Sequence, residues 1–200
     1  MRTRLLLILG AVGMALLIPQ NGVAGEKETM KSNPKVAMET SMGTITVELW
    51  PDKAPKTVEN FLRYVDEQFY EDTLFHRVID GFMIQGGGMT REMERKPTHK
   101  PIVNEASTEL KNERGTIAMA RTQVVDSATS QFFINVADNE FLDHQGNTPD
   151  RFGYAVFGKV VDGMDVVDRI EEVETTAVGP HRDVPETPVL IKRVYRVDSD

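Results

Sequence analysis

Residues 35–49 alternate between apolar and polar positions in a way that predicts β-structure. Val36 and Met38 occupy alternate positions, residues 41–43 carry a turn signal, and residues 45–49 alternate again. Successive side chains of a strand point to opposite faces, so each run presents one apolar face. The pattern therefore predicts a hairpin with one side in the core.

The apolar period changes to that of a helix after residues 51–55, whose two prolines interrupt the sheet. Between Val58 and Val65, apolar side chains recur at positions i, i+3, i+4 and i+7, which is one stripe of an amphipathic helix. Pro55 suits the first turn of a helix because an N–H is not needed there. We expect a helix from Pro55 to about Gln68 with this stripe in the core.

Further aromatic and β-branched runs predict more strands, and a second stripe predicts a short helix over residues 164–170. Residues 138–151 are expected to form a loop, residues 89–101 a surface loop, and residues 171–188 a long acidic, proline-containing connection. The additional strands are predicted at residues 75–79, 115–121, 131–136, 154–160 and 188–197. This content indicates a mainly β fold, a closed antiparallel β-barrel capped by two α-helices.

Residues 75–88 place one arginine and one glutamine among large apolar side chains and end in three glycines. On a regular strand Arg77 shares a face with Phe75 and Ile79, and Gln85 can reach it across the intervening turn. A lone arginine on a strand is most often a solvated edge charge. Here the apolar neighbours can exclude water, so we favour a binding cleft.

Several common chemistries lack their characteristic residues. The four histidines are scattered without a metal-ligand spacing, and no Gly-x-Ser-x-Gly elbow is present. The glycines at 86–88 are not followed by the Lys-Ser/Thr of a phosphate-binding loop, so they predict a bend or a bulge. We therefore expect neither a metal nor a cofactor.

The first 25 residues have the pattern of a cleaved secretory signal. Arg2 and Arg4 precede an apolar run too short for a comfortable bilayer span, and small residues predict cleavage after Ala24 or Gly25. An uncleaved N-terminal anchor is the alternative. We expect a signal peptide at 1–25, a linker at 26–34 and one domain at 35–200.

The net charge and the cysteine content limit the cellular compartments and the classes of binding partner that fit this chain. Loss of the two signal-peptide arginines takes the net charge from −8 to about −10, which disfavours nucleic acid and anionic membranes as partners. The chain has no cysteine, which excludes lipoprotein attachment and a disulfide framework. An exported protein of this kind fits a bacterial periplasm.

An arginine in apolar surroundings is suited to rotation about an X-Pro peptide bond. The guanidinium stays charged and is a poor proton carrier, but bond rotation requires no proton transfer. The barrier of about 18–20 kcal/mol comes from amide resonance. A donor that binds the prolyl nitrogen as conjugation is lost would stabilise the twisted state selectively.

Several ordered motifs resemble the cyclophilin family over about residues 36–197. They comprise FHRVI (75–79), GFMIQGG (81–87), AMA (118–120), SQFFI (130–134) and VFGKV (156–160). With the signal and FLDH (141–144), the chain looks like the periplasmic bacterial cyclophilin A type. The resemblance implies an eight-stranded barrel and peptidyl-prolyl cis-trans isomerase activity that assists the folding of exported proteins.

Site residues carry over from the family position by position. Arg77 would be the catalytic arginine, and Gln85 would orient it and bind the substrate backbone. Ala120 and the backbone of Arg121 would bind the substrate chain, and Gln131 would border the groove. The proline pocket would be lined by Phe82, Met83, Phe133 and Leu142.

The chain departs from the family pattern at several positions. Phe141 stands where eukaryotic members have a tryptophan that helps to bind cyclosporin, so weak cyclosporin binding is expected. Tyr154 replaces a common histidine at the pocket edge, Arg121 a common asparagine, and Asp80 a usual proline. The segment after Gly88 lacks the family's glycine-rich loop, so specificity beyond the proline can differ.

Two other functional classes compete with a monomeric isomerase acting on proline-containing segments. A proline-peptide binding module or holdase chaperone would use the same groove without turnover, but it would tolerate loss of Arg77. A purely structural barrel would leave Arg77 and Gln85 among apolar residues without a purpose. The isomerase is therefore the preferred hypothesis.

Overall fold

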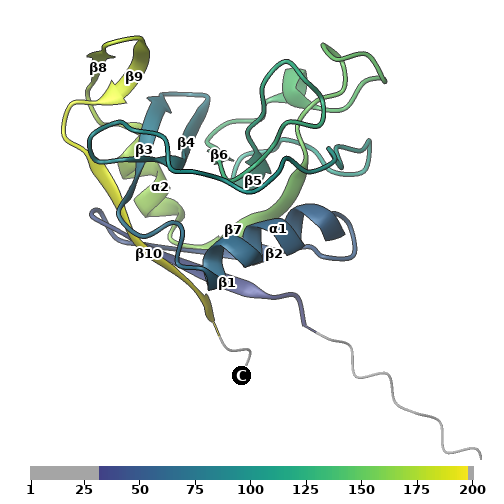
Figure 1. Cartoon of the computed structure of the whole chain (residues 1–200), viewed down its shortest axis with the longest axis horizontal. Helices are drawn as coiled ribbons and strands as arrows, with labels where there is room; N and C mark the ends of the chain where they lie inside the picture. Colours follow the sequence, from purple (N-terminus) through teal and green to yellow (C-terminus); the bar gives the residue numbers. More distant parts are fainter. Residues whose placement is uncertain (1–31, 198–200) are drawn as a thin grey trace, which may run out of the picture. The chain divides into compact units, whose positions relative to one another are not determined.

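The computed structural model describes residues 32–197 (Figure 1). The predicted signal peptide and residues 26–31 of the predicted linker lie outside the described residues. The elements in chain order are β1 (Lys35–Thr40), β2 (Thr44–Leu49), α1 (Pro55–Asp66), β3 (Thr73–Ile79), β4 (Met83–Thr90), β5 (Thr116–Met119), β6 (Phe132–Asn135), the 3₁₀ helix η1 (Glu140–Leu142), β7 (Val156–Asp162), α2 (Met164–Glu171), β8 (Thr175–Val178), β9 (His181–Pro185) and β10 (Val189–Val197). Neither α-helix of this range is long and apolar enough to cross a lipid bilayer.

Eight of the strands close into a barrel in the order β1-β10-β3-β4-β6-β5-β7-β2. All adjacent strands are antiparallel, so the predicted closed antiparallel barrel is confirmed. β1 and β2 form the predicted hairpin, and β1 pairs on its other side with β10. The first and last strands of the domain are therefore neighbours in the sheet.

Helix α1 packs its predicted apolar stripe into the barrel core. Phe61 is fully buried, and its ring centroid lies 5.2–5.7 Å from those of Tyr70, Phe132 and Phe157. Aromatic pairs at such separations add to the stabilisation from area burial. Pro55 occupies the first turn as predicted, and the helix ends at Asp66, two residues before the expected end.

The predicted connection at residues 171–188 is wrong in part, because β8 and β9 form a two-stranded hairpin there. All four residues of β8 are exposed, so no apolar alternation marks the strand in the sequence. β9 packs against β3 (Figure 1). The hairpin thereby lies beside the strand that carries Arg77.

The pairing of β3 with β4 is irregular. Phe75 pairs with Gly86 and Arg77 with Gln85, so an extra residue of β3 lies between these pairs. Phe75 is consequently in the barrel core while Arg77 lies outside it, and the prediction that both share a face is wrong. Bulges of this kind break the period of two. The glycines at 86–88 lie in β4 at a second register shift, which confirms the predicted bend or bulge.

Candidate active site

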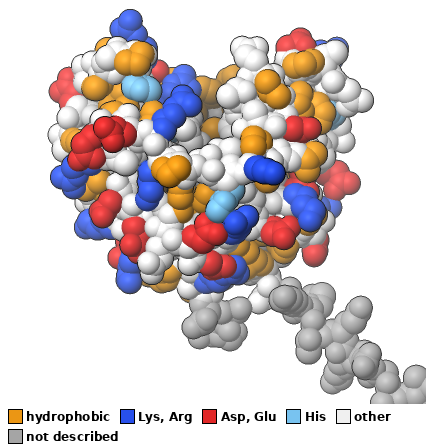
Figure 2. All heavy atoms as spheres, in the orientation of Figure 1, with side chains coloured by type: hydrophobic (Ala, Val, Ile, Leu, Met, Phe, Trp, Pro, Cys, Tyr) orange, Lys and Arg blue, Asp and Glu red, His pale blue; other side chains and the backbone are white. Residues whose placement is uncertain are grey.

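A pocket of about 130 Å³ opens on the outside of the barrel wall. Its walls come from β3, β4, β6 and η1. The segment that follows β5 and the segment that precedes β7 complete them. Its lining consists of Arg77, Phe82, Met83, Gln85, Ala120, Arg121, Phe133, Leu142 and Tyr154. All nine residues were predicted as site residues from the sequence. Figure 2 shows the surface hollowed at its upper edge, between the lobe that contains the β8–β9 hairpin and the loops on the opposite side.

Strand alternation explains how the apolar pocket residues reach the outer face. Ile84 and Ile134 point into the barrel core, while Met83 and Phe133 beside them belong to a second apolar cluster outside the sheet. Phe133 is 4% exposed and meets Tyr154 edge-on, with ring centroids 5.7 Å apart. The buried floor of the pocket is therefore fixed by the pleat of the strands.

Arg77 is one of two arginines that line the pocket. Its side chain is 41% exposed, and its Nε lies 3.4 Å from Oδ2 of Asp183 in β9. Gln85 lies opposite Arg77 in the sheet, but its Nε2 donates to Oε1 of Gln131 at 2.9 Å. Gln131, predicted to border the groove, thus lies beside a lining residue but does not line the pocket itself. Asp183 was not expected, because no apolar pattern marks its hairpin.

Arg121 uses its side chain to hold the loop before β7. Its guanidinium donates to the carbonyl oxygens of Gly153, Pro149 and Thr122 at 2.9–3.0 Å. The guanidinium carbon also lies 4.8 Å from the centroid of the Tyr154 ring, in a cation–π contact. From the sequence, only the backbone of Arg121 was expected to contact the substrate. The structure adds the fixing of Tyr154 at the pocket edge.

The 3₁₀ helix η1 carries Phe141 and Leu142 to the rim of the pocket. Leu142 is 8% exposed and lines the pocket. Phe141 is 68% exposed and does not line it, but its ring lies 5.4 Å from that of Phe82. The predicted substrate-binding residue Phe141 thus extends the apolar rim outward from Phe82.

Buried polar groups support this rim from behind. Nδ2 of Asn139 donates to the carbonyl oxygen of Phe82 at 2.9 Å and to Oδ1 of Asn135 at 2.8 Å, and the carbonyl of Asn139 accepts the N–H of Leu142. Both sides of the rim are therefore tied to one asparagine. No sequence pattern marks Asn139, because a buried asparagine and a loop asparagine look alike in a single chain.

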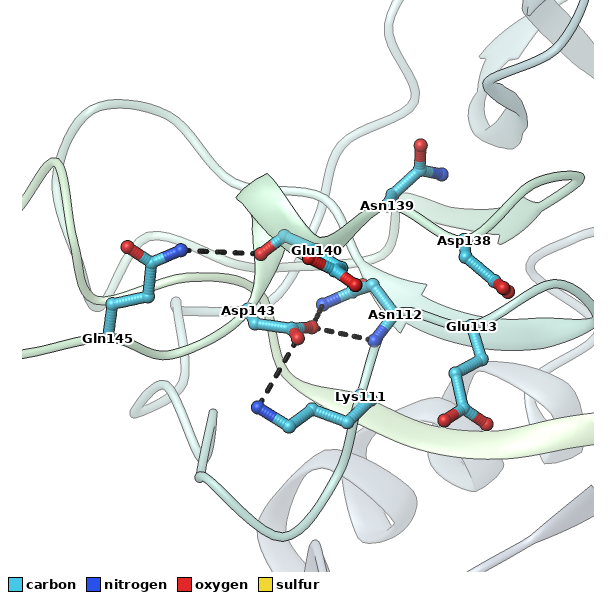
Figure 3. A pocket seen from close by; sticks show the side chains of 8 residues that line it. All are labelled: Lys111, Asn112, Glu113, Asp138, Asn139, Glu140, Asp143 and Gln145. Carbon is cyan, nitrogen blue, oxygen red and sulfur yellow. Dashed lines mark hydrogen bonds and ion pairs between the residues drawn. The ribbon is translucent and has the colours of Figure 1, made fainter.

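A second cavity of about 350 Å³ lies behind η1 and is lined by polar residues (Figure 3). The Asp143 carboxylate there accepts from the backbone and side-chain N–H groups of Asn112 and lies 3.3 Å from Nζ of Lys111. Among residues 32–197, no three His, Cys, Asp or Glu side chains are arranged to hold a metal ion. Asp143 instead anchors the C-terminal end of η1.

His76 lies directly beside Arg77 on β3 and was not singled out in the sequence. It is 7% exposed, and burial lowers the pKa of its imidazole from 6.5 to about 4. Its Nδ1 has no hydrogen-bond partner in the part of the chain that the structure describes. His76 is therefore neutral at pH 7 and adds no charge next to Arg77.

Known proteins resemble this chain closely in sequence. The family model for "cyclophilin type peptidyl-prolyl cis-trans isomerase/CLD" matches residues 35–196. Peptidyl-prolyl cis-trans isomerase B of Escherichia coli (strain K12) is 56% identical over 159 residues, which cover 80% of this chain and 97% of that protein. Peptidyl-prolyl cis-trans isomerase A of Dickeya dadantii is 56% identical over 157 residues, covering 78% of this chain and 81% of the relative.

Solved structures agree with the sequence comparison. A cyclophilin type peptidyl-prolyl cis-trans isomerase of Cryptosporidium parvum matches with a TM-score of 0.69 and 26% identity, over 84% of this chain and 99% of that one. A second structure, in the presence of the dipeptide Ala-Pro, matches with a TM-score of 0.68 over 82% of this chain. The chain belongs to the family of cyclophilin-type peptidyl-prolyl cis-trans isomerases.

Proposed function

We propose that the pocket around Arg77 is the site at which this isomerase binds and turns X-Pro bonds of exported proteins. The observation that carries the proposal is the position of the Arg77 guanidinium at the edge of a pocket that has a buried apolar floor. The pyrrolidine ring would rest against Met83, Phe133 and Leu142. Arg77 would donate to the prolyl nitrogen as amide resonance is lost, which stabilises the twisted state over either planar state.

The surroundings of Arg77 favour such electrostatic stabilisation. The Gln85 side chain is held by Gln131, so this polar group beside Arg77 is ordered before a substrate arrives. Ordered donors act most strongly where water is excluded. An acceleration of about 10⁵-fold would require roughly 7 kcal/mol of differential stabilisation. We assign to the backbone near Ala120 and Arg121 the role of binding the substrate chain.

We further propose that the chain consists of a signal peptide (1–25), a linker (26–34) and an isomerase domain (35–200). The signal peptide would direct its export to a bacterial periplasm, where the protein would work as a monomer. The support is the basic and apolar pattern of the first residues, the absence of cysteine and the similarity to bacterial isomerases. Its substrates would be proline-containing segments of partly folded exported proteins. Fractionation of cells that express the full chain, or a chain lacking residues 1–25, tests the location.

We also propose that cyclosporin binds weakly. Phe141 has no N–H to donate, whereas the family's tryptophan has an indole N–H at this position. Phe141→Trp is expected to tighten cyclosporin binding with little change in isomerase activity. Titration of both proteins with cyclosporin, followed by inhibition of turnover, measures the difference.

The test of Arg77 is the cis-to-trans rate of a short Ala-Pro peptide with the purified protein. Uncatalysed exchange takes tens of seconds or more, so catalysis is easily resolved. Arg77→Ala is expected to lower kcat/KM by about 100-fold or more, in the range found when a transition-state donor is removed. Arg196→Ala is the matched control, because Arg196 pairs with Asp66 on the surface and lies outside the pocket lining.

Two results would contradict the proposal. Equal rates for the wild type and Arg77→Ala would remove Arg77 from the mechanism. Peptide binding by the wild type without acceleration of exchange would instead favour a binding module or holdase. Circular dichroism and urea unfolding of each variant establish that the variants are folded.

A further inference from the structure

Asp183 brings a carboxylate to Arg77 from an element that lies outside the barrel. Its Oδ2 is 3.4 Å from Nε of Arg77, and the two side chains are 39% and 41% exposed. No hydrogen bond from Nη1 or Nη2 of Arg77 to another of residues 32–197 is present, and Asp183 is the only ion-pair partner of Arg77 in that range. The carboxylate thus contacts Arg77 on its Nε side and leaves both terminal amino groups available.

The backbone at Asp183 is shaped in a way that directs this side chain. Thr176 pairs with Val184 and Val178 with His181, so two residues of β9 oppose one residue of β8. Asp183 lies in this bulge with a φ of +57°, in the left-handed region that non-glycine residues seldom adopt. Bulges re-aim side chains, and strained residues persist where the surrounding structure maintains them. The bulge turns Asp183 toward β3.

The placement of the hairpin fixes the side from which Arg77 is held. β9 packs against β3, whereas the substrate-binding segment near Ala120 follows β5, which is separated from β3 by β4 and β6 (Figure 1). The two flanks of the groove thus have different tasks. One flank presents the predicted substrate-binding backbone, and the other presents a carboxylate to the arginine.

We propose that Asp183 is a positioning residue that holds Arg77 by Nε and directs its terminal amino groups toward the prolyl bond. The inference rests on the proposed role of Arg77. Removing Asp183 would leave the long arginine side chain free to leave the productive geometry. Since a misplaced catalytic group slows the chemical step, kcat is lowered more than KM changes.

The carboxylate has a second, opposing effect on Arg77. Its negative charge weakens the positive potential at the guanidinium, so its removal would raise kcat if charge alone mattered. At two-fifths exposure, solvent screens this charge effect, but solvent does not replace the lost orientation. Orientation is therefore expected to decide the sign, and loss of Asp183 lowers activity.

Two substitutions separate geometry from charge at this position. Asp183→Asn keeps an oxygen acceptor of the same shape and tolerates the left-handed backbone, while Asp183→Gly removes the acceptor and fits that backbone without strain. We expect kcat to be highest for the wild type, lower for Asp183→Asn and lowest for Asp183→Gly. The loss for the glycine variant is expected to be about fivefold. Glu186→Gln is the control, because it removes one negative charge at the end of the same hairpin.

A double substitution tests whether Asp183 acts through Arg77. Alanine leaves no guanidinium for Asp183 to hold, so Asp183→Gly is expected to have no further effect on the residual activity in the Arg77→Ala background. A loss that persists in that background would show a general effect of the hairpin and overturn the inference. Equal kcat in the wild type and Asp183→Gly would also overturn the inference. A kcat above that of the wild type in Asp183→Asn or Asp183→Gly would do the same.

These outcomes are distinct from failure of the proposed function. If Arg77→Ala loses activity while Asp183→Gly keeps it, Arg77 is catalytic and only the positioning role is wrong. If Arg77→Ala keeps full activity, the proposed function of Arg77 is wrong regardless of Asp183. Urea unfolding of every variant, and assays at a temperature where each remains folded, separate both outcomes from loss of structure.

Discussion

His76 makes the stability of the domain depend on pH in a defined direction. Burial beside Arg77 lowers the pKa of the imidazole to about 4, whereas the unfolded chain has the ordinary value of 6.5. Between these two values the unfolded state binds the proton and the folded state does not. The free energy of unfolding therefore rises with pH through this window, and it falls as the pH is lowered from 7 towards 4.

The size of the effect follows from the two pKa values. A fall of the His76 pKa from 6.5 to about 4 on folding lowers the free energy of unfolding by roughly 3 kcal/mol once the pH is below both values. About 2 kcal/mol of this contribution is expressed between pH 7 and pH 5. Because the side chain is only 7% exposed, solvent screening removes little of it.

Urea unfolding of the wild type and His76→Gln at pH 7, 6 and 5 measures this contribution. Glutamine offers an amide N–H near the position of Nε2 but does not titrate in this range. The wild type is expected to lose about 2 kcal/mol more than the variant between pH 7 and pH 5. Other titrating groups are present in both proteins and cancel in the comparison. Parallel pH dependences for the two proteins would refute the neutral, buried state of His76.

Two further predictions concern close packing and the pocket rim. In Gly87→Ala a Cβ would lie 2.7 Å from the Phe132 ring at a φ of +80°, so unfolding is expected to become easier by about 2–4 kcal/mol. Gly81→Ala is the control, since its φ is +65° and no atom lies within 4 Å, and about 1 kcal/mol is expected. Asn139→Ala leaves the buried carbonyl of Phe82 with one hydrogen bond fewer and is expected to cost about 1–3 kcal/mol and to raise KM more than it lowers kcat. Urea unfolding and steady-state kinetics measure these effects, and an unchanged KM for the folded Asn139→Ala protein would contradict the role of the rim.

The barrel was predictable because its core residues follow simple periods. The stripe of α1 and the alternation in β1 and β2 place the core side chains correctly. The pocket lining comes partly from outward-facing strand residues and partly from loops and η1, and the resemblance to a known family identified its members individually. All nine lining residues were anticipated in this way.

The features that were missed depend on local irregularity or on contacts across the fold. The bulge between Phe75 and Arg77 breaks strand alternation, and a rule based on period two cannot locate it. The β8–β9 hairpin has an exposed first strand, so its sequence resembles a loop. The side-chain role of Arg121 depends on carbonyl groups about 30 residues away, at Pro149 and Gly153. Periodicity carries no information about such pairs.

The neighbouring positions of β1 and β10 have a consequence for the order of folding. Of the eight barrel strands, β10 is the last to be synthesised, yet it pairs with both β1 and β3. Until its residues are available, β1 and β3 each have an open edge. Such pairing between the ends of a chain slows folding and leaves edges exposed meanwhile. The barrel of this isomerase therefore closes only after the seven other barrel strands have been synthesised.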